Sequence, residues 1–107
     1  MKTDVKVIQP IGLFDGTKAP QFQQQISDSV QNDVKIIVID LKDVTFMDSS
    51  GLGALVLSLK RVRAAGAKLL LCSTNEQIAM LFKLTSMDRV FEIFSSREEL
   101  EQKLLHH

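Results

Sequence analysis

One short run of aliphatic residues constrains the fold of this chain more than any other feature. Residues 35–41 read Lys-Ile-Ile-Val-Ile-Asp-Leu, a nearly continuous stretch of apolar and mostly β-branched side chains. Strands with one solvent-exposed face alternate apolar and polar residues, whereas strands covered on both faces are continuous apolar runs. Such strands lie between layers of helices, so residues 35–41 predict the central strand of an α/β fold.

The other segments alternate between strand and helix patterns. Strand patterns occupy residues 4–9, 67–72 and 90–94, and residues 12–16 read as a turn. Apolar residues at helical spacing mark four further segments. They are about 18–32, a segment that begins near 49 and ends before 66, 75–84, and the residues that follow a capping box at 96–99. We therefore expect one α/β domain over residues 1–107, with a mixed central sheet of about five strands and four helices packed against it.

Charge and composition exclude several classes of protein. The 13 Lys and Arg residues balance the 13 Asp and Glu residues, so nothing in the charge favours nucleic acid or an anionic membrane. Apolar runs stay well short of the roughly 18 residues that span a bilayer, and the first residues do not form a secretory segment. The single cysteine, Cys72, lies in an apolar strand and has no partner for a disulfide. We expect a cytoplasmic protein that is not inserted in a membrane.

The segment from Phe46 to Gly53 connects the central strand to the second helix and reads Phe-Met-Asp-Ser-Ser-Gly-Leu-Gly. Asp and Ser are preferred helix N-caps, so a simple cap explains much of this pattern. A serine at a helix N-terminus also faces backbone N–H groups and the positive end of the helix dipole. Phosphate on such a serine would be stabilised, so Ser49 is a candidate for chemical switching.

Catalytic readings of the same segment fail on specific grounds. The two histidines are His106 and His107, at the extreme C-terminus, where they are consistent with a purification-tag remnant. Ser49 and Ser50 therefore lack a histidine base within the body of the fold, and they do not lie in the Gly-x-Ser-x-Gly pattern of a nucleophile elbow. We expect no catalytic residues and no enzymatic activity.

Ligand-binding motifs are incomplete as well. Gly51 and Gly53 match the first two glycines of a dinucleotide fingerprint, but Val56 occupies the third position. No Gly-Lys-Ser or Gly-Lys-Thr phosphate loop is present, and the aspartates at 40, 43 and 48 do not have the spacing of a metal loop. We expect neither a cofactor nor a metal.

Residues 48–53, preceded by the apolar run at 36–41 and by Phe46-Met47, closely resemble the STAS-domain family of bacterial anti-sigma factor antagonists. The resemblance covers nearly the whole chain. Further matching segments are the early turn with Gly12 and Asp15, the helix exit at 65–69 and the third helix at 81–85.

The resemblance implies a signal-transduction protein that works by partner switching in transcription regulation. Ser49 matches the family's phosphoacceptor, which an anti-sigma factor that is also a serine kinase phosphorylates and a metal-dependent serine phosphatase restores. Unphosphorylated, such an antagonist sequesters the kinase and frees a sigma factor. The resemblance assigns the switch loop to Asp48, Ser50, Gly51, Leu52 and Gly53, with Asp15 as a further contact.

Two observations leave other readings open. The early turn reads Gly-Leu-Phe-Asp-Gly where the family has Gly-x-Leu-Asp, and Pro20 lies in the helix that follows. STAS domains also occur in lipid transporters and in larger signalling assemblies. The alternative function is a constitutive STAS subunit of such a complex, with Ser49 unused.

Overall fold

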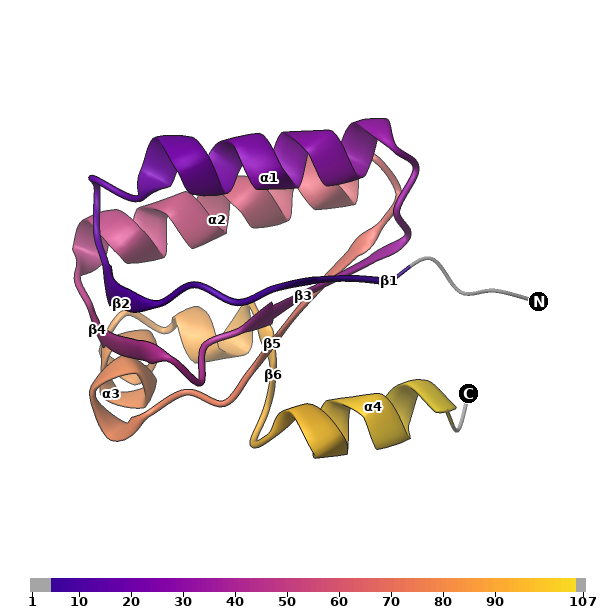
Figure 1. The fold of residues 1–107 in the computed structure, drawn as a ribbon. Helices are drawn as coiled ribbons and strands as arrows, with labels where there is room; N and C mark the ends of the chain where they lie inside the picture. Colours follow the sequence, from indigo (N-terminus) through magenta and orange to yellow (C-terminus); the bar gives the residue numbers. More distant parts are fainter. Residues whose placement is uncertain (1–4, 106–107) are drawn as a thin grey trace.

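A computed structural model describes residues 5–105, so His106 and His107 lie outside the described residues. Strands and helices alternate along the chain (Figure 1). They are β1 (Val5–Ile8), β2 (Gly12–Phe14), α1 (Ala19–Gln31), β3 (Ile36–Asp40), β4 (Val44–Met47), α2 (Ser49–Ala64), β5 (Lys68–Cys72), α3 (Glu76–Leu84), the 3₁₀ turn η1 (Met87–Arg89), β6 (Glu92–Phe94) and α4 (Arg97–Leu105). The expected α/β class with four helices is confirmed.

The strands form two sheets. The larger one has four strands in the order β1-β3-β5-β6, and the smaller one pairs β2 with β4. Every strand pair within residues 5–105 is parallel. The arrangement thus differs in detail from the single mixed sheet of about five strands that the sequence suggests. Residues 12–14, expected in a turn, form β2 because they pair with β4, a long-range contact that local turn signals do not report.

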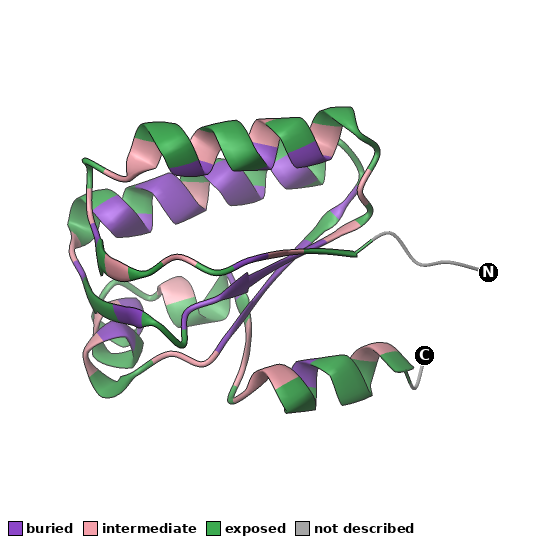
Figure 2. Cartoon of the chain, in the orientation of Figure 1, coloured by how far each residue is buried: buried purple, intermediate pink, exposed green. Residues whose placement is uncertain are grey.

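The central strand β3 is covered on both faces, as its sequence predicts. Ile37 and Ile39 belong to the larger apolar core, which α1, α2 and α3 share, while Val38 packs with Leu70, Cys72 and Leu100 on the opposite face. Figure 1 shows α1 and α2 side by side on one face of the sheet and α4 on the other. In Figure 2 the buried residues of α1 and α2 lie where these helices meet each other and the sheet.

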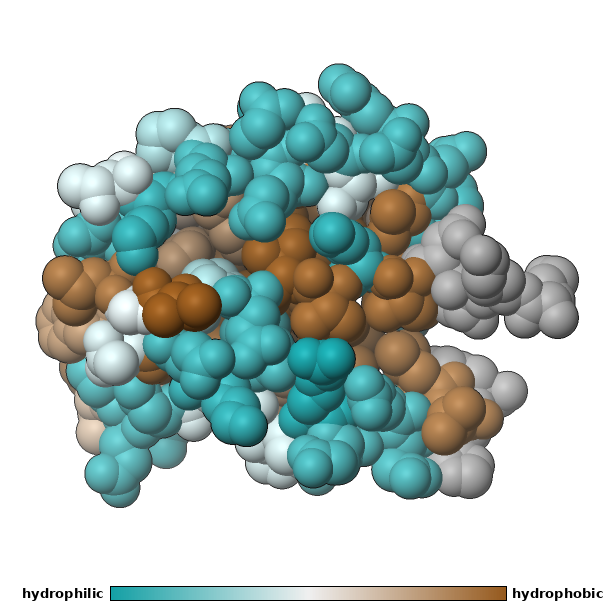
Figure 3. Space-filling model, in the orientation of Figure 1, coloured by the Kyte–Doolittle hydropathy of each residue, from teal (hydrophilic) through white to brown (hydrophobic). Residues whose placement is uncertain are grey.

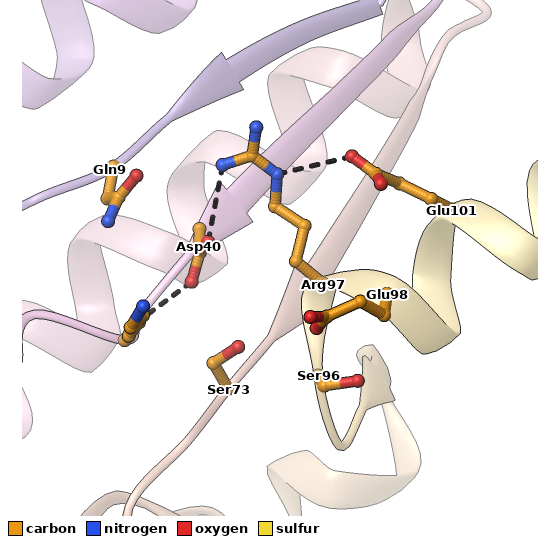
Figure 4. A pocket seen from close by; sticks show the side chains of 8 residues that line it. Gln9, Asp40, Ser73, Ser96, Arg97, Glu98 and Glu101 are labelled. Atoms are coloured by element: carbon orange, nitrogen blue, oxygen red, sulfur yellow. Dashed lines mark hydrogen bonds and ion pairs between the residues drawn. The ribbon is translucent and has the colours of Figure 1, made fainter.

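The C-terminal helix α4 is fastened to the sheet by one buried leucine and one ion pair. Leu100 is buried, and Arg97 Nη1 lies 3.4 Å from Asp40 Oδ2 (Figure 4). Asp40 is 3% exposed, and its Oδ1 also accepts a hydrogen bond from the backbone N–H of Lys42 at 3.0 Å. The predicted capping box forms in part: the Ser96 hydroxyl accepts from the Glu99 N–H at 3.1 Å, while the Glu99 carboxylate accepts from the N–H of Ser95, at 2.9 Å, and not from that of Ser96.

Helix α2 approaches β2 so closely that only glycine fits at position 51. A Cβ on Gly51 would lie 2.0 Å from the carbonyl oxygen of Phe14. Two positions on, a Cβ on Gly53 would meet nothing within 4 Å. The two glycines of the 48–53 segment therefore differ in role: Gly51 is required by packing and Gly53 is not.

We predict that Arg97→Met destabilises the protein by about 1–2 kcal/mol, because it leaves the buried Asp40 carboxylate without its cation. This is less than the roughly 3–5 kcal/mol seen when a fully buried pair is broken, since Arg97 is partly exposed and Asp40 keeps the Lys42 N–H. Urea unfolding measures the change. Lys103→Met, on the exposed side of the same helix, is the control, and an equal loss in both variants would contradict the prediction.

The glycines give a second, paired prediction. Gly51→Ala should lower the free energy of unfolding by at least about 2 kcal/mol, because backbone at Phe14 must move to admit the methyl group. Gly53→Ala should raise it by about 0.5–1 kcal/mol, since alanine is the better helix former and its methyl group meets open space. Thermal and urea unfolding of both variants test this, and similar effects at the two positions would refute it.

Candidate functional site

The pairing of β2 with β4 brings two predicted site residues together. Phe14 is opposite Met47 in the parallel register, so Asp15 and Asp48 leave the two strands at the same edge of the small sheet. In an open parallel arrangement the carboxyl ends of strands are where ligands and partners meet the fold. The structure thus joins residues that are far apart in the sequence.

Asp48 caps helix α2, as the simple reading of the segment predicts. Its backbone is extended, and its Oδ1 accepts a hydrogen bond from the Gly51 N–H at 2.9 Å. Ser49 is the first residue of the helix and Ser50 the second, and both are exposed. The first N–H groups of a helix have no intrahelical acceptor. The capping role and the proposed switching role are therefore compatible, because they use different residues.

The remaining residues of the predicted switch loop divide into two groups. Gly53 is exposed, whereas Gly51 lies against Phe14 and Leu52 is 6% exposed. A partner that approaches this end of α2 would meet Ser49, Ser50 and Gly53 directly. Gly51 and Leu52 would affect binding only indirectly, because they set where the start of α2 lies.

Asp15 is held in a tight turn before α1. Its Oδ1 accepts a hydrogen bond from the Thr17 N–H at 3.0 Å and another from the Thr17 hydroxyl. The hydroxyl contact lowers the pKa of the Asp15 carboxyl below its usual value, with the Thr17 N–H and Lys18 acting in the same direction. Asp15 is therefore a carboxylate at neutral pH. The next residue, Gly16, lies beside Ser50, since a Cβ at Gly16 would be 3.5 Å from that of Ser50.

Sequence reasoning missed the side chains that hold this region in place. The Gln77 amide pairs with both backbone groups of Met47, accepting from its N–H at 2.9 Å and donating to its carbonyl at 2.8 Å. Asn75 Nδ2 donates to the carbonyls of Val44 and Thr45. Lys18 Nζ donates to those of Ile11 and Leu13 at 3.0 and 2.9 Å. The contacts of Gln77 and Asn75 join segments about 30 residues apart, so no local pattern could have revealed them.

The rest of the described chain shows no second group of residues that matches the predicted site. A surface cavity of about 480 Å³ is lined by Asp40, Arg97 and neighbouring polar residues, none of which belongs to the predicted switch loop (Figure 4). Within residues 5–105, no three His, Cys, Asp or Glu side chains come together as a metal site.

Cys72 is buried, as expected of a small apolar residue in this strand, and burial raises the pKa of its thiol. No helix in that range has the length and apolar character to cross a bilayer.

Comparison with proteins of known structure confirms the architecture. A crystal structure of a Thermotoga maritima protein superposes with a TM-score of 0.86 at 28% identity, covering 95% of this chain and 90% of that one. The STAS domain of a Vibrio cholerae SulP transporter gives 0.81 at 20% identity, covering 98% and 84%. The phosphorylated form of the Bacillus cell fate determinant SpoIIAA gives 0.74 at 21% identity, covering 96% and 93%. The last two likenesses concern the fold alone.

Sequence comparison identifies both relatives and a family. The anti-sigma-B factor antagonist of Bacillus subtilis is 30% identical over 87 residues, which are 81% of this chain and 79% of that protein. Its counterpart in Listeria monocytogenes is 28% identical over 89 residues, or 83% and 78%. The family model of the STAS domain matches residues 1–100. The chain therefore belongs to the STAS domain family.

Proposed function

We propose that this protein is an anti-sigma factor antagonist whose binding is switched by phosphorylation of Ser49. The observation that carries the proposal is the position of Ser49, which is exposed at the first residue of α2, directly after the capping Asp48. The similarity to named anti-sigma factor antagonists supports the same role.

A phosphate at Ser49 is compatible with the fold. It adds about 1.5–2 negative charges at neutral pH, and the N-terminus of α2 favours negative charge. Because Ser49 is exposed, the group extends into solvent and displaces no core side chain. We therefore expect the modification to change what binds to this surface and to leave the fold unaltered.

The same phosphate would change the local charge strongly. Asp15 and Asp48 already place two carboxylates at this edge of the small sheet. With the phosphate added, three anionic groups would lie at or next to this edge of the small sheet. A partner that fits the unmodified surface would meet like-charge repulsion and lose hydrogen bonds, which costs several kcal/mol at an interface.

The proposed cycle needs two partners. Unmodified, the antagonist binds an anti-sigma factor that is also a serine kinase, and this frees a sigma factor in the cytoplasm. The kinase transfers a phosphoryl group to Ser49 and releases the antagonist, and a metal-dependent serine phosphatase removes the group. The antagonist itself acts as a binding protein without catalysis.

The second candidate function is a constitutive STAS subunit of a signalling or lipid-transport complex. The likeness to a transporter STAS domain supports it at the level of the fold. The two candidates differ at Ser49, which the first requires and the second leaves unused. Phosphorylation of the native chain thus distinguishes them.

We predict that an anti-sigma factor serine kinase of the same organism adds one phosphoryl group, and that the group maps to Ser49. Ser49→Ala should abolish labelling, because it removes the acceptor, while Ser50→Ala should only weaken it. Intact mass and peptide mapping provide the measurement. Phosphate on Ser50, or no labelling of the native chain by any such kinase, would overturn the assignment.

The affinity for this kinase should fall at least about a hundredfold on phosphorylation, corresponding to roughly 2.7 kcal/mol. Ser49→Asp should reproduce part of the loss because it carries one negative charge, and Ser49→Ala should bind persistently. Calorimetric titration of the four forms gives the affinities, with unchanged thermal midpoints showing that the fold is intact. Equal affinities for the phosphorylated and unmodified proteins would refute the switch.

A further inference from the structure

Two large apolar side chains lie side by side and exposed on the small sheet. Leu13 of β2 is opposite Phe46 of β4 in the parallel register. Leu13 is 55% exposed and Phe46 is 48% exposed, while the next residues, Phe14 and Met47, are almost fully buried. The small sheet therefore has one face in the core and an outer face that presents an apolar pair.

This pair is continuous with the Ser49 surface. Alternate residues of a strand point to the same side and lie about 6.6 Å apart. The alternation of β4 is interrupted at Thr45, but from Phe46 onward it is regular: Phe46 is exposed, Met47 is buried, and Asp48 is extended and half-buried. Phe46 and Asp48 therefore share one face. Ser49 follows directly. A partner protein that covers the exposed apolar pair therefore also reaches the carboxylate of Asp48 and the hydroxyl of Ser49.

The backbone beneath the pair is held on both sides. Lys18 Nζ binds the carbonyls of Ile11 and Leu13, and Asn75 binds those of Val44 and Thr45. The Gln77 amide binds both backbone groups of Met47. A surface fixed in this way loses little conformational freedom when a partner binds, which favours affinity.

Figure 3 shows hydrophobic side chains at the left of the molecule, where β2 and β4 lie in Figure 1. Exposed apolar groups that cluster beside polar ones are typical of protein–protein contact sites. The acidic pair at positions 15 and 48 borders the cluster on the side of α2. A partner surface that complements this one would have an apolar pocket for the pair and basic side chains at the edge of that pocket.

We propose that Leu13 and Phe46 form the apolar anchor on which the anti-sigma factor docks when it engages Ser49. This inference rests on the proposed function and specifies the partner's surface: an apolar pocket for the pair, flanked by basic residues that face Asp15 and Asp48. The anchor supplies affinity that does not depend on the charge of Ser49. Phosphorylation therefore weakens the complex by repulsion at the edge of the interface and leaves the apolar contact available.

The test uses Leu13→Thr, Phe46→Thr and the double variant in the full chain, with the purified kinase that labels Ser49 as the probe. Each single change should weaken binding about tenfold, corresponding to roughly 1.4 kcal/mol, and the double change should weaken it further. In the phosphorylation assay KM should rise while kcat stays unchanged, because the anchor does not touch the reacting atoms. Val5→Thr, which alters an exposed strand residue of the larger sheet, is the matched control and should bind as the native protein does.

The outcomes separate this inference from the proposed function. If the native protein binds the kinase and the phosphorylated form does not, but the Leu13 and Phe46 variants bind as tightly as the native protein, the anchor is wrong and the switch stands. If no such kinase binds or labels the native protein, the proposed function itself fails. If sedimentation shows a dimer that these variants dissociate, the pair is occupied by a second copy of the chain and the proposed partner is wrong. Equal thermal midpoints exclude unfolding as the cause of weakened binding.

Discussion

The close contact between Gly51 and the carbonyl of Phe14 fixes the start of α2, where we propose that partners bind. Because no side chain intervenes, the first turn of α2 rests directly on the backbone of β2. This contact fixes the position of Ser49, at the start of that turn, relative to the small sheet. It also places Ser50 beside Gly16. A bulkier residue at position 51 would move the helix start away from β2 and separate Ser49 from Asp15.

Around this contact the structure divides its tasks between two ends. The four-stranded sheet, with α1 and α2 on one face and α4 on the other, buries most of the apolar residues and supplies the stability. The two-stranded sheet adds Phe14 and Met47 to that core, presents the exposed apolar pair on its outer face, and is followed directly by Asp15 on one strand and by Asp48 and Ser49 on the other. Such a division suits a binding protein, since the surface can change its charge while the core stays as it is.

The charges of the site support control by a single modification. Asp48 uses one carboxylate oxygen to cap the helix, and Asp15 uses one to close its own turn. Both carboxylates thus serve the fold and also make the surface acidic. The phosphate that we propose at Ser49 would add to this negative charge, and a partner that accepts the unmodified surface need not accept the modified one.

The sequence by itself determined the α/β class, the positions of the four helices and the start of α2, because these depend on local periodicity and on capping residues. The apolar run at 36–41 and the Asp48-Ser49 pair are signals of this kind. Tertiary structure alone decided that residues 12–14 pair with β4, that Gln77 and Asn75 hold β4 from α3, and that Gly51 faces the core while Gly53 faces solvent. It also placed Leu13 beside Phe46. These features arise from contacts between segments about 30 residues apart, whose pairing depends on the packing of the whole chain and leaves no periodic pattern in either segment.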